Sequence, residues 1–176
     1  GSVTFINLEG TRPILIEIQA LVDKSMLPNP KRLTVGTDAQ RLTMLLAILH
    51  RHVTLSTYDQ DVFLNAVGGI KINETASDLA VLIAIVSSMT NQAVSSKTAI
   101  FGEVGLGGEI RPVSRGQERI KEASKLGFKR IIVPLKNKAS DIPDVEIIGV
   151  DNLRDAVKVV FGSNRVKNDE QIYPDE

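Results

Sequence analysis

The sequence contains no cysteine and no tryptophan, and only 4% of its 176 residues are aromatic. Without thiols there can be no disulfide, no thiolate zinc site and no cysteine nucleophile, which fits a reducing, cytoplasmic setting. No apolar run approaches the roughly 20 residues that cross a bilayer, and no signal-peptide pattern is present, so no membrane partner is expected. The core must rest on Ile, Val, Leu and Ala, in a chain that is 43% hydrophobic and 24% charged.

The formal net charge of zero hides an uneven distribution along the chain. Residues 111–138 carry nine Lys or Arg against two Glu, whereas residues 139–176 carry four against nine Asp or Glu. The charge of such a segment says more about the partners that a protein can bind than the net charge of the whole chain does. Two interpretations of the basic segment stay open: a surface that contacts phosphate groups, or a solvated helix face with Glu118 and Glu122 between the cations.

Hydrophobic periodicity predicts strands and helices in irregular alternation. Strands are expected at residues 13–21, 32–35, 61–67, 98–104, 109–113, 129–134 and 145–150. Helices are expected after capping-box-like starts at residues 37–40 and 75–78, and at residues 117–126 and 152–161. This order favours a mixed α/β (α+β) domain over a doubly wound nucleotide-binding sheet.

The expected domain organisation is simple. Residues 1–12 are interpreted as a cloning remnant and linker from an upstream domain, and residues 13–162 as the folded domain. Residues 163–176 are polar and are expected to be a disordered tail.

Two histidines lie near the end of the first expected helix. His50 and His52 are two residues apart and so point to different sides of a helix, which argues against a shared metal ion. Cationic groups beside the negative end of the helix dipole are the simpler interpretation. No metal site is predicted.

A glycine-rich segment, FGEVGLGGEIRPV, begins at Phe101. Gly107 is not followed by the Lys and Ser/Thr of a phosphate loop, and the segment leads into a strand instead of the helix of a dinucleotide fingerprint. Glu103 and Glu109 would also repel phosphate. We therefore predict a tight turn between two strands, and no ATP hydrolysis by this chain.

The same segment resembles the strand-turn-strand that precedes the catalytic lysine in the proteolytic domain of Lon proteases. The resemblance implies a Lon-like fold with a mixed sheet and packed helices, and a Ser–Lys catalytic pair. Measured from this segment, the lysine position is Gln117. The family's Gly-Pro-Ser-Ala block falls on residues 74–77, so the serine position is Ala76. Alanine offers no nucleophile and glutamine no base, so we predict a domain without peptidase activity.

In an alternative interpretation the domain is an active peptidase whose two catalytic residues lie at neighbouring positions. Ser77 is the next residue along the helix, and Lys121 lies one turn beyond Gln117 on the same face. An active Lon-type serine peptidase that uses Ser77 and Lys121 therefore stays open.

Four runs together resemble the Lon-like C-terminal domain of the bacterial DNA repair protein family RadA (Sms). They are RLTMLLAILHRH, DQDVFLNAVGGIKINETASDLAVLIAIVSS, FGEVGLGGEIRPV and ERIKEASKLGFKRIIVP. The resemblance implies a bacterial, cytoplasmic RecA-like ATPase that drives branch migration in homologous recombination. It also implies that ATP, Mg and Zn are bound in upstream domains, with no cofactor in this chain.

In that family the Lon-like domain helps to assemble a hexameric ring and contributes to sequence-independent binding of single-stranded or branched DNA. The basic segment supplies the residues expected to contact phosphates. They are Arg111, Arg115, Arg119, Lys121, Lys125, Lys129 and Arg130.

Overall fold

The computed structural model describes residues 1–162, which form nine strands, four α-helices and two short 3-10 helices. The strands are β1 (Ser2–Glu9), β2 (Arg12–Lys24), β3 (Arg32–Val35), β4 (Gln60–Ala66), β5 (Thr98–Ile100), β6 (Glu103–Val104), β7 (Ile110–Arg111), β8 (Arg130–Pro134) and β9 (Glu146–Val150). The helices are α1 (Ala39–Val53), α2 (Asp78–Thr90), α3 (Gly116–Lys125) and α4 (Leu153–Phe161), with the 3-10 helices η1 (Thr75–Ser77) and η2 (Leu135–Asn137). The predicted mixed α/β class is confirmed. The expected polar tail, residues 163–176, lies outside the described residues.

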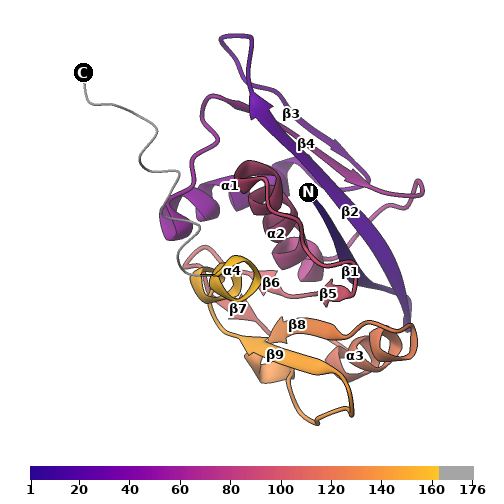
Figure 1. Cartoon of the computed structure of the whole chain (residues 1–176). Coiled ribbons are helices and arrows are strands. Elements are labelled where there is room, and N and C mark those ends of the chain that lie inside the picture. The colour runs from indigo at the N-terminus through magenta and orange to yellow at the C-terminus, as the bar shows by residue number, and fades with distance from the viewer. Residues whose placement is uncertain (163–176) are drawn as a thin grey trace.

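Seven strands form one sheet in the order β3-β4-β2-β1-β5-β8-β9 (Figure 1). The pairs β1–β2 and β2–β4 are antiparallel, whereas β3–β4, β1–β5, β5–β8 and β8–β9 are parallel. The sheet is therefore mixed, with an antiparallel centre joined to a parallel half. The remaining strands, β6 and β7, pair with each other as a separate antiparallel ribbon.

Strand β1 corrects the prediction that residues 1–12 are a remnant and linker. Ser2–Glu9 lies in the middle of the sheet between β2 and β5, and Val3, Phe5 and Ile6 are fully buried. The alternation of apolar and polar residues from Ser2 to Phe5 is the pattern of a strand. The domain therefore includes the first nine residues.

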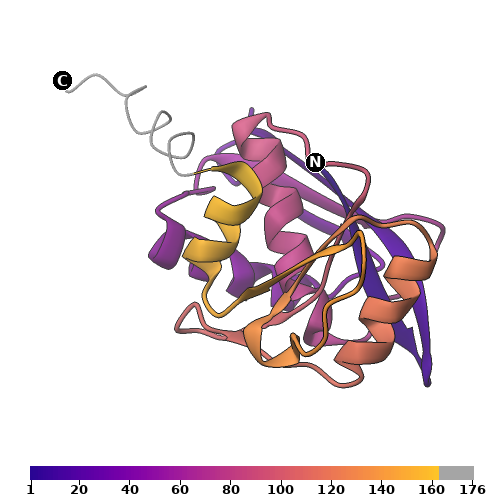
Figure 2. The same cartoon turned by 60° about the horizontal axis from the view of Figure 1, so that its bottom comes forward.

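Three helices cover one face of the sheet and the fourth lies on the other. Helix α2 is buried nearly all round between the sheet, α1 and α4, as its continuous apolar sequence predicts. Helix α3 packs against β1, β2 and β8, on the opposite side from α2 and α4 (Figure 2). Within the described range, no helix has the length and apolar character needed to cross a membrane.

The starts of α1 and α2 differ in detail from their predicted capping boxes. Asp38, one residue after the predicted Thr37, caps α1 by accepting a hydrogen bond from the backbone N–H of Arg41 at 3.0 Å. Thr75 does not cap α2. It opens η1 and donates its hydroxyl to Glu103 Oε2 at 2.5 Å.

The glycine-rich segment forms the predicted turn between β6 and β7. Its backbone closes with a hydrogen bond from Gly108 N–H to Gly105 O at 2.9 Å. His52, at the end of α1, supports the turn because its Nε2 lies 2.9 Å from Leu106 O. Gly108 has φ +77°, and a Cβ there would lie 2.8 Å from the His52 ring, so glycine is required twice over. Packing against this turn is the observed role of His52.

Candidate functional site

The glycine-rich segment lies directly against Ala76, the predicted serine position. The backbone N–H of Gly102 donates to Ala76 O at 2.8 Å, and the N–H of Leu79 donates to Gly102 O at 3.0 Å. This contact explains why the expected single strand over residues 98–104 breaks into β5 and β6: Gly102 pairs with η1 and α2 instead of a neighbouring strand. Ala76 itself is buried and presents only a methyl group.

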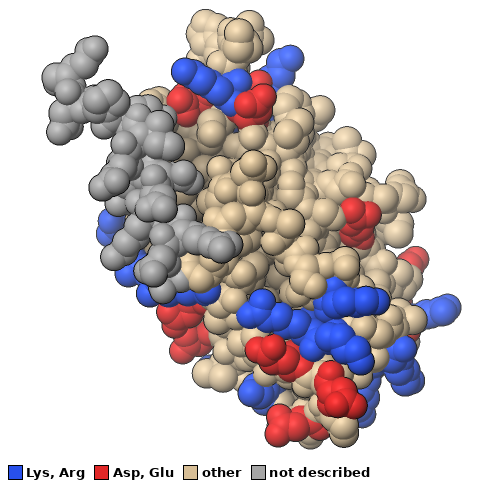
Figure 3. Space-filling model, viewed as in Figure 1, with Lys and Arg blue, Asp and Glu red and all other residues tan. Residues whose placement is uncertain are grey.

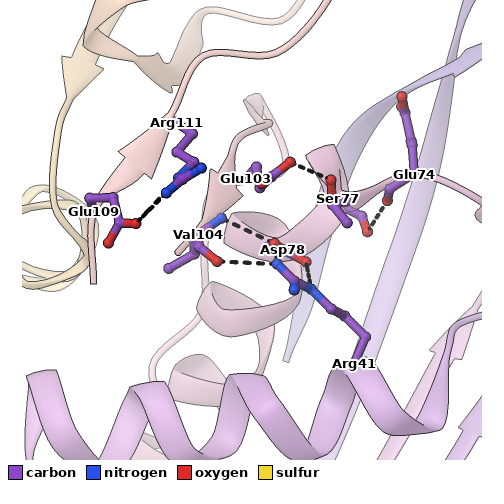
Figure 4. Close-up of polar contacts among 9 residues, drawn as sticks. Arg41, Glu74, Ser77, Asp78, Glu103, Val104, Glu109 and Arg111 are labelled. Atoms are coloured by element: carbon purple, nitrogen blue, oxygen red, sulfur yellow. Dashed lines mark hydrogen bonds and ion pairs between the residues drawn. The ribbon is translucent and has the colours of Figure 1, made fainter. Parts of the chain in front are cut away.

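Asp78, the first residue of α2, joins three elements (Figure 4). Its carboxylate forms a two-point ion pair with Arg41 of α1 and accepts the backbone N–H of Val104 at 3.0 Å. Arg41 also donates to Val104 O at 3.1 Å. Burial raises the pKa of the Asp78 carboxyl, although the hydrogen bonds from Arg41 and Val104 oppose that rise. The bond to Asp78 raises the pKa of the Arg41 guanidinium in turn. The pair fixes the start of α2 against α1 and β6, and the Asp78 side chain is only 1% exposed.

Arg119 is buried, which corrects its predicted place on a DNA-contacting surface. Its guanidinium has 0% exposure and forms a two-point ion pair with Glu74 at 2.6 and 2.8 Å. It also donates to Ser114 O at 3.0 Å and Ile6 O at 2.8 Å, and it lies 5.7 Å from the Phe101 ring centroid. Arg119 is a structural residue that ties α3 to β1 and to the start of η1.

The orientation of α3 separates Lys121 from Ser77. Arg119 points toward Glu74, and Lys121 is two residues further on, about 200° around the helix. Lys121 is exposed, and the Ser77 hydroxyl already donates to Glu74 O at 3.0 Å (Figure 4). A catalytic lysine must be desolvated and near its nucleophile, so the shifted Ser77–Lys121 pair lacks both requirements in this structure.

Gln117 supports the loop before α3. Its Nε2 donates to Asn137 O at 2.5 Å. The Asn137 side chain, in turn, accepts from Val113 N–H at 2.8 Å and donates to Val113 O at 3.0 Å. Sequence reasoning did not single out Asn137, because nothing local marks an asparagine in η2 as the anchor of a loop 24 residues earlier.

The remaining predicted cations divide between the two ends of α3. At the start of the helix, Arg115 and Arg111 are exposed, and Arg111 pairs with Glu109 at 3.1 Å. Toward the other end, Lys121 in the middle of the helix, Lys125 at its last residue and Lys129 beyond it are exposed. Along the helix axis Lys125 lies about 15 Å from Arg115 and Lys121 about 9 Å from it, and the intervening Arg119 is buried. The basic segment therefore makes two clusters and not one continuous patch.

A lysine that sequence reasoning missed joins the second cluster. The backbone carbonyl of Lys97 accepts the N–H of Lys129 at 2.9 Å and that of Arg130 at 3.2 Å, because β5 and β8 are parallel neighbours. Arg130 turns away to donate to Val159 O at 2.7 Å and is only half-exposed. We call Lys97, Lys121, Lys125 and Lys129 the basic corner. Figure 3 shows Lys and Arg side chains gathered over this region of α3 and the adjoining strands, with acidic side chains between them.

An apolar row crosses the open face of the sheet at its other end. Phe63 of β4 pairs with Leu21 of β2 on one side and with Leu33 of β3 on the other. Leu21, Leu33 and Val35 are each more than half exposed. The row reaches β3, which is an edge strand of the sheet. We call these four residues the apolar row.

Comparison with known proteins assigns the family. The model of the family described as subunit ChlI of Mg-chelatase matches residues 44–137, more than half of the chain, from α1 to η2. The chain is 56% identical over 162 residues to DNA repair protein RadA of Pseudomonas aeruginosa, covering 92% of the chain and 36% of that relative. It is 54% identical over 160 residues to RadA of Escherichia coli (90% and 35%) and 43% identical over 164 residues to RadA of Bacillus subtilis (92% and 36%).

The chain thus spans about a third of the length of these relatives. It belongs to the family described as subunit ChlI of Mg-chelatase, and over nine-tenths of its length it is similar to the bacterial DNA repair protein RadA.

Proposed function

We propose that this chain is a non-catalytic, Lon-like domain of a RadA-type DNA repair ATPase, a motor for branch migration in homologous recombination. Its part is to contact DNA without regard to sequence and to associate with copies of itself in a ring, a hexamer in the longer protein. ATP, Mg and Zn are bound outside this chain. The similarity to RadA proteins in several bacteria supports the repair role.

The positions of Ala76 and Gln117 support the non-catalytic part of the proposal. Ala76 has no nucleophile, and the Gln117 amide cannot act as a base and is engaged with Asn137. The ion pairs of Glu74 with Arg119 and of Asp78 with Arg41 use the carboxylates on either side of Ala76. The alternative of a peptidase that uses Ser77 and Lys121 gains no support, because Lys121 is exposed on the side of α3 away from Ser77.

The basic corner is the observation that carries the DNA-binding part. Its four lysines are exposed: Lys121 and Lys125 lie on α3, and Lys97 and Lys129 are the residues just before β5 and β8. Contacts of this kind neutralise phosphates and need no base-specific chemistry. Acidic neighbours such as Glu122 and Glu146 reduce the local potential, which favours a weak contact that works together with other parts of the longer protein.

The apolar row supports self-association. Exposed leucine and valine side chains around the half-buried Phe63, beside an unpaired strand edge, offer both apolar area and free backbone groups. A second copy of this chain is the partner that fits a ring. The basic corner and the apolar row lie at different ends of the sheet order, so both contacts are available at once.

A salt titration of DNA binding tests the proposal. Fluorescence anisotropy would compare the wild type with Lys121→Ala/Lys125→Ala/Lys129→Ala on single-stranded and branched oligonucleotides of unrelated sequence. We expect the variant to bind more weakly on every sequence, with a dependence of log K on log salt that is flatter by about 2 on single strands.

A matched control keeps the same change in charge. Lys24, Lys31 and Lys71 are also exposed but lie toward the β2–β4 half of the molecule, and their replacement by alanine should leave binding nearly unchanged. Equal losses in both triple variants, or binding that ignores salt, would exclude the basic corner as the contact surface.

A further inference from the structure

Strand β3 lies at the margin of the seven-stranded sheet, beyond β4 (Figure 1), and within residues 1–162 it is paired on that one side only. The backbone N–H of Val62 in β4 donates to Lys31 O at 2.9 Å. Backbone groups alternate in direction along a strand, so Leu33 also faces β4, whereas the N–H and C=O groups of Arg32 and Thr34 point to the free edge. In the described part of the chain, these edge groups have no hydrogen bond to another segment.

The same strand carries exposed apolar side chains on the open face of the sheet. Leu33 is 56% exposed and Val35 is 53% exposed. Leu33 is also the outermost member of the apolar row along the line of paired positions, because it lies beside Phe63, which lies beside Leu21. The free backbone groups and the end of the apolar row thus meet at one edge.

The charge that could guard this edge is turned away from it. Exposed edge strands are commonly protected from pairing by a charged side chain or a proline. The only charged side chain of β3 is that of Arg32, and its guanidinium donates to Gln60 O at the start of β4. Pro30 has no N–H, and Gly36 O already accepts the N–H of Ile72 at 2.8 Å. An added strand can therefore pair only with the short stretch between Pro30 and Gly36.

A second copy of this chain offers the matching groups. When two β3 strands run antiparallel about a two-fold axis at Leu33, Arg32 of each copy comes opposite Thr34 of the other. Each such pair exchanges both of its N–H and C=O groups. Lys31 comes opposite Val35, so no like charges meet. The two Leu33 residues face each other at the axis with their Cα atoms about 4.5 Å apart.

We propose that β3 pairs with β3 of a second copy in this antiparallel register. The pairing joins the two apolar rows into one, from Leu21, Phe63 and Leu33 of one copy to the same residues of the other. The proposal rests on the self-association proposed above and names its contact. A strand pair this short gives a weak, reversible dimer, since stable interfaces bury roughly 800 Å² on each partner. A two-fold contact joins copies in pairs, so a hexamer that uses it is built from such pairs.

Cysteine cross-linking of the whole chain tests the register, because the sequence contains no cysteine. In Leu33→Cys the two thiols face each other at a Cα separation within the range of about 4.4–6.8 Å that a disulfide spans. Val35→Cys and Leu21→Cys are matched controls at positions that are 53% and 58% exposed. Across the pair, the two copies of these positions lie about 13 Å and about 24 Å apart. With oxidised glutathione as the oxidant, Leu33→Cys should form the disulfide-linked dimer at least about tenfold faster than either control.

A proline variant tests the backbone hydrogen bonds. Thr34→Pro removes an N–H that faces the free edge and no bond to β4, which is where edge strands tolerate proline. Thr34→Val is the matched control, because it also loses the hydroxyl that donates to Thr37 O but keeps the N–H. In sedimentation equilibrium, the dissociation constant of Thr34→Pro should exceed that of Thr34→Val by at least about tenfold.

The outcomes separate this contact from self-association in general. Equal cross-linking at the three cysteine positions, or equal dissociation constants of the two Thr34 variants, overturns the pairing of β3 with itself. If the wild type still associates in that case, the proposed self-association stands and uses a different contact. A wild-type chain that stays monomeric up to about 1 mM overturns both, and leaves the edge of β3 to an extended segment of another protein.

Discussion

Arg119 and Glu74 form a two-point ion pair that connects α3 to the segment just before η1, with Nη1 and Nη2 of Arg119 at 2.6 and 2.8 Å from the Glu74 carboxylate oxygens. Glu74 also accepts the backbone N–H of Leu8 at 2.9 Å. The pair thus joins β1, α3 and η1 around Ala76, the position at which the resemblance to Lon proteases predicts a serine. A charged residue of the basic segment has become part of the domain's interior.

Replacement of Arg119 by methionine should destabilise the fold strongly. The substitution leaves Glu74 without its cation and removes the donors to Ser114 O and Ile6 O, so we expect a loss of about 3 kcal/mol in the free energy of unfolding. Urea unfolding measures it. Lys121→Met on the exposed side of the same helix should change stability by less than about 0.5 kcal/mol. Equal effects of the two substitutions would contradict a structural role for Arg119.

Stability should also depend on Asp78 in a pH-sensitive way. Burial raises the pKa of Asp78 in the folded protein above the 3.8 of the free side chain. The folded state then binds the Asp78 proton more tightly than the unfolded chain does, so the contribution of Asp78 is largest below pH 3.8 and falls as the pH rises through the raised pKa. The Asp78→Asn variant lacks this titration. The unfolding free energy that it loses relative to the wild type should therefore be largest in acid and decrease toward neutral pH.

Urea unfolding of the wild type and of Asp78→Asn at several pH values checks this prediction. Asp38→Asn, at an exposed cap on the neighbouring helix, serves as the control for general effects of removing a carboxylate. A cost of Asp78→Asn that grows with pH would mean that Arg41 outweighs burial and holds Asp78 ionised.

The sequence predicted the parts of this fold whose causes are local. The helix over residues 152–161, the continuous apolar sequence of α2 and the glycines of the β6–β7 turn each depend on residues close to the structure they determine. The identification of Gln117 depended on the same turn, and that of Ala76 on the start of the helix that follows Ala76.

The missed features depend on residues far apart in the chain. Arg119 is buried because Glu74, 45 residues earlier, supplies its counter-charge. Lys97 joins Lys129 because β5 and β8 are neighbours, and β1 is a central strand because β2 and β5 flank it. Neither amphipathic pattern nor segment charge contains these pairings, so the sequence could not separate the buried Arg119 from the exposed cations of the basic segment.

No peptidase activity is expected from the described residues. Wild type and Ser77→Ala should give the same background in a fluorescent casein assay, because the Ser77 hydroxyl is bonded to Glu74 O and Lys121 is exposed on the other side of α3. Lys121→Met should also leave the background unchanged. Cleavage that disappears in both variants would restore the shifted catalytic pair and overturn the non-catalytic proposal.

Self-association through the apolar row can be separated from folding, because the side chains involved are exposed. Leu21→Glu/Leu33→Glu places two charges on either side of Phe63 and removes apolar area that an interface would bury, at about 1.5 kcal/mol or more for each leucine. We therefore expect the dissociation constant of the self-associated state, measured by sedimentation equilibrium, to rise by at least about 100-fold. Leu126→Glu alters a leucine of similar exposure just after α3 that is not part of the apolar row, and it should leave association unchanged. Because neither change touches the core, the unfolding midpoints should match the wild type, which separates a lost contact from a lost fold. Weaker association in Leu126→Glu than in the double variant would place the contact on the α3 side instead, where it would compete with DNA for the basic corner.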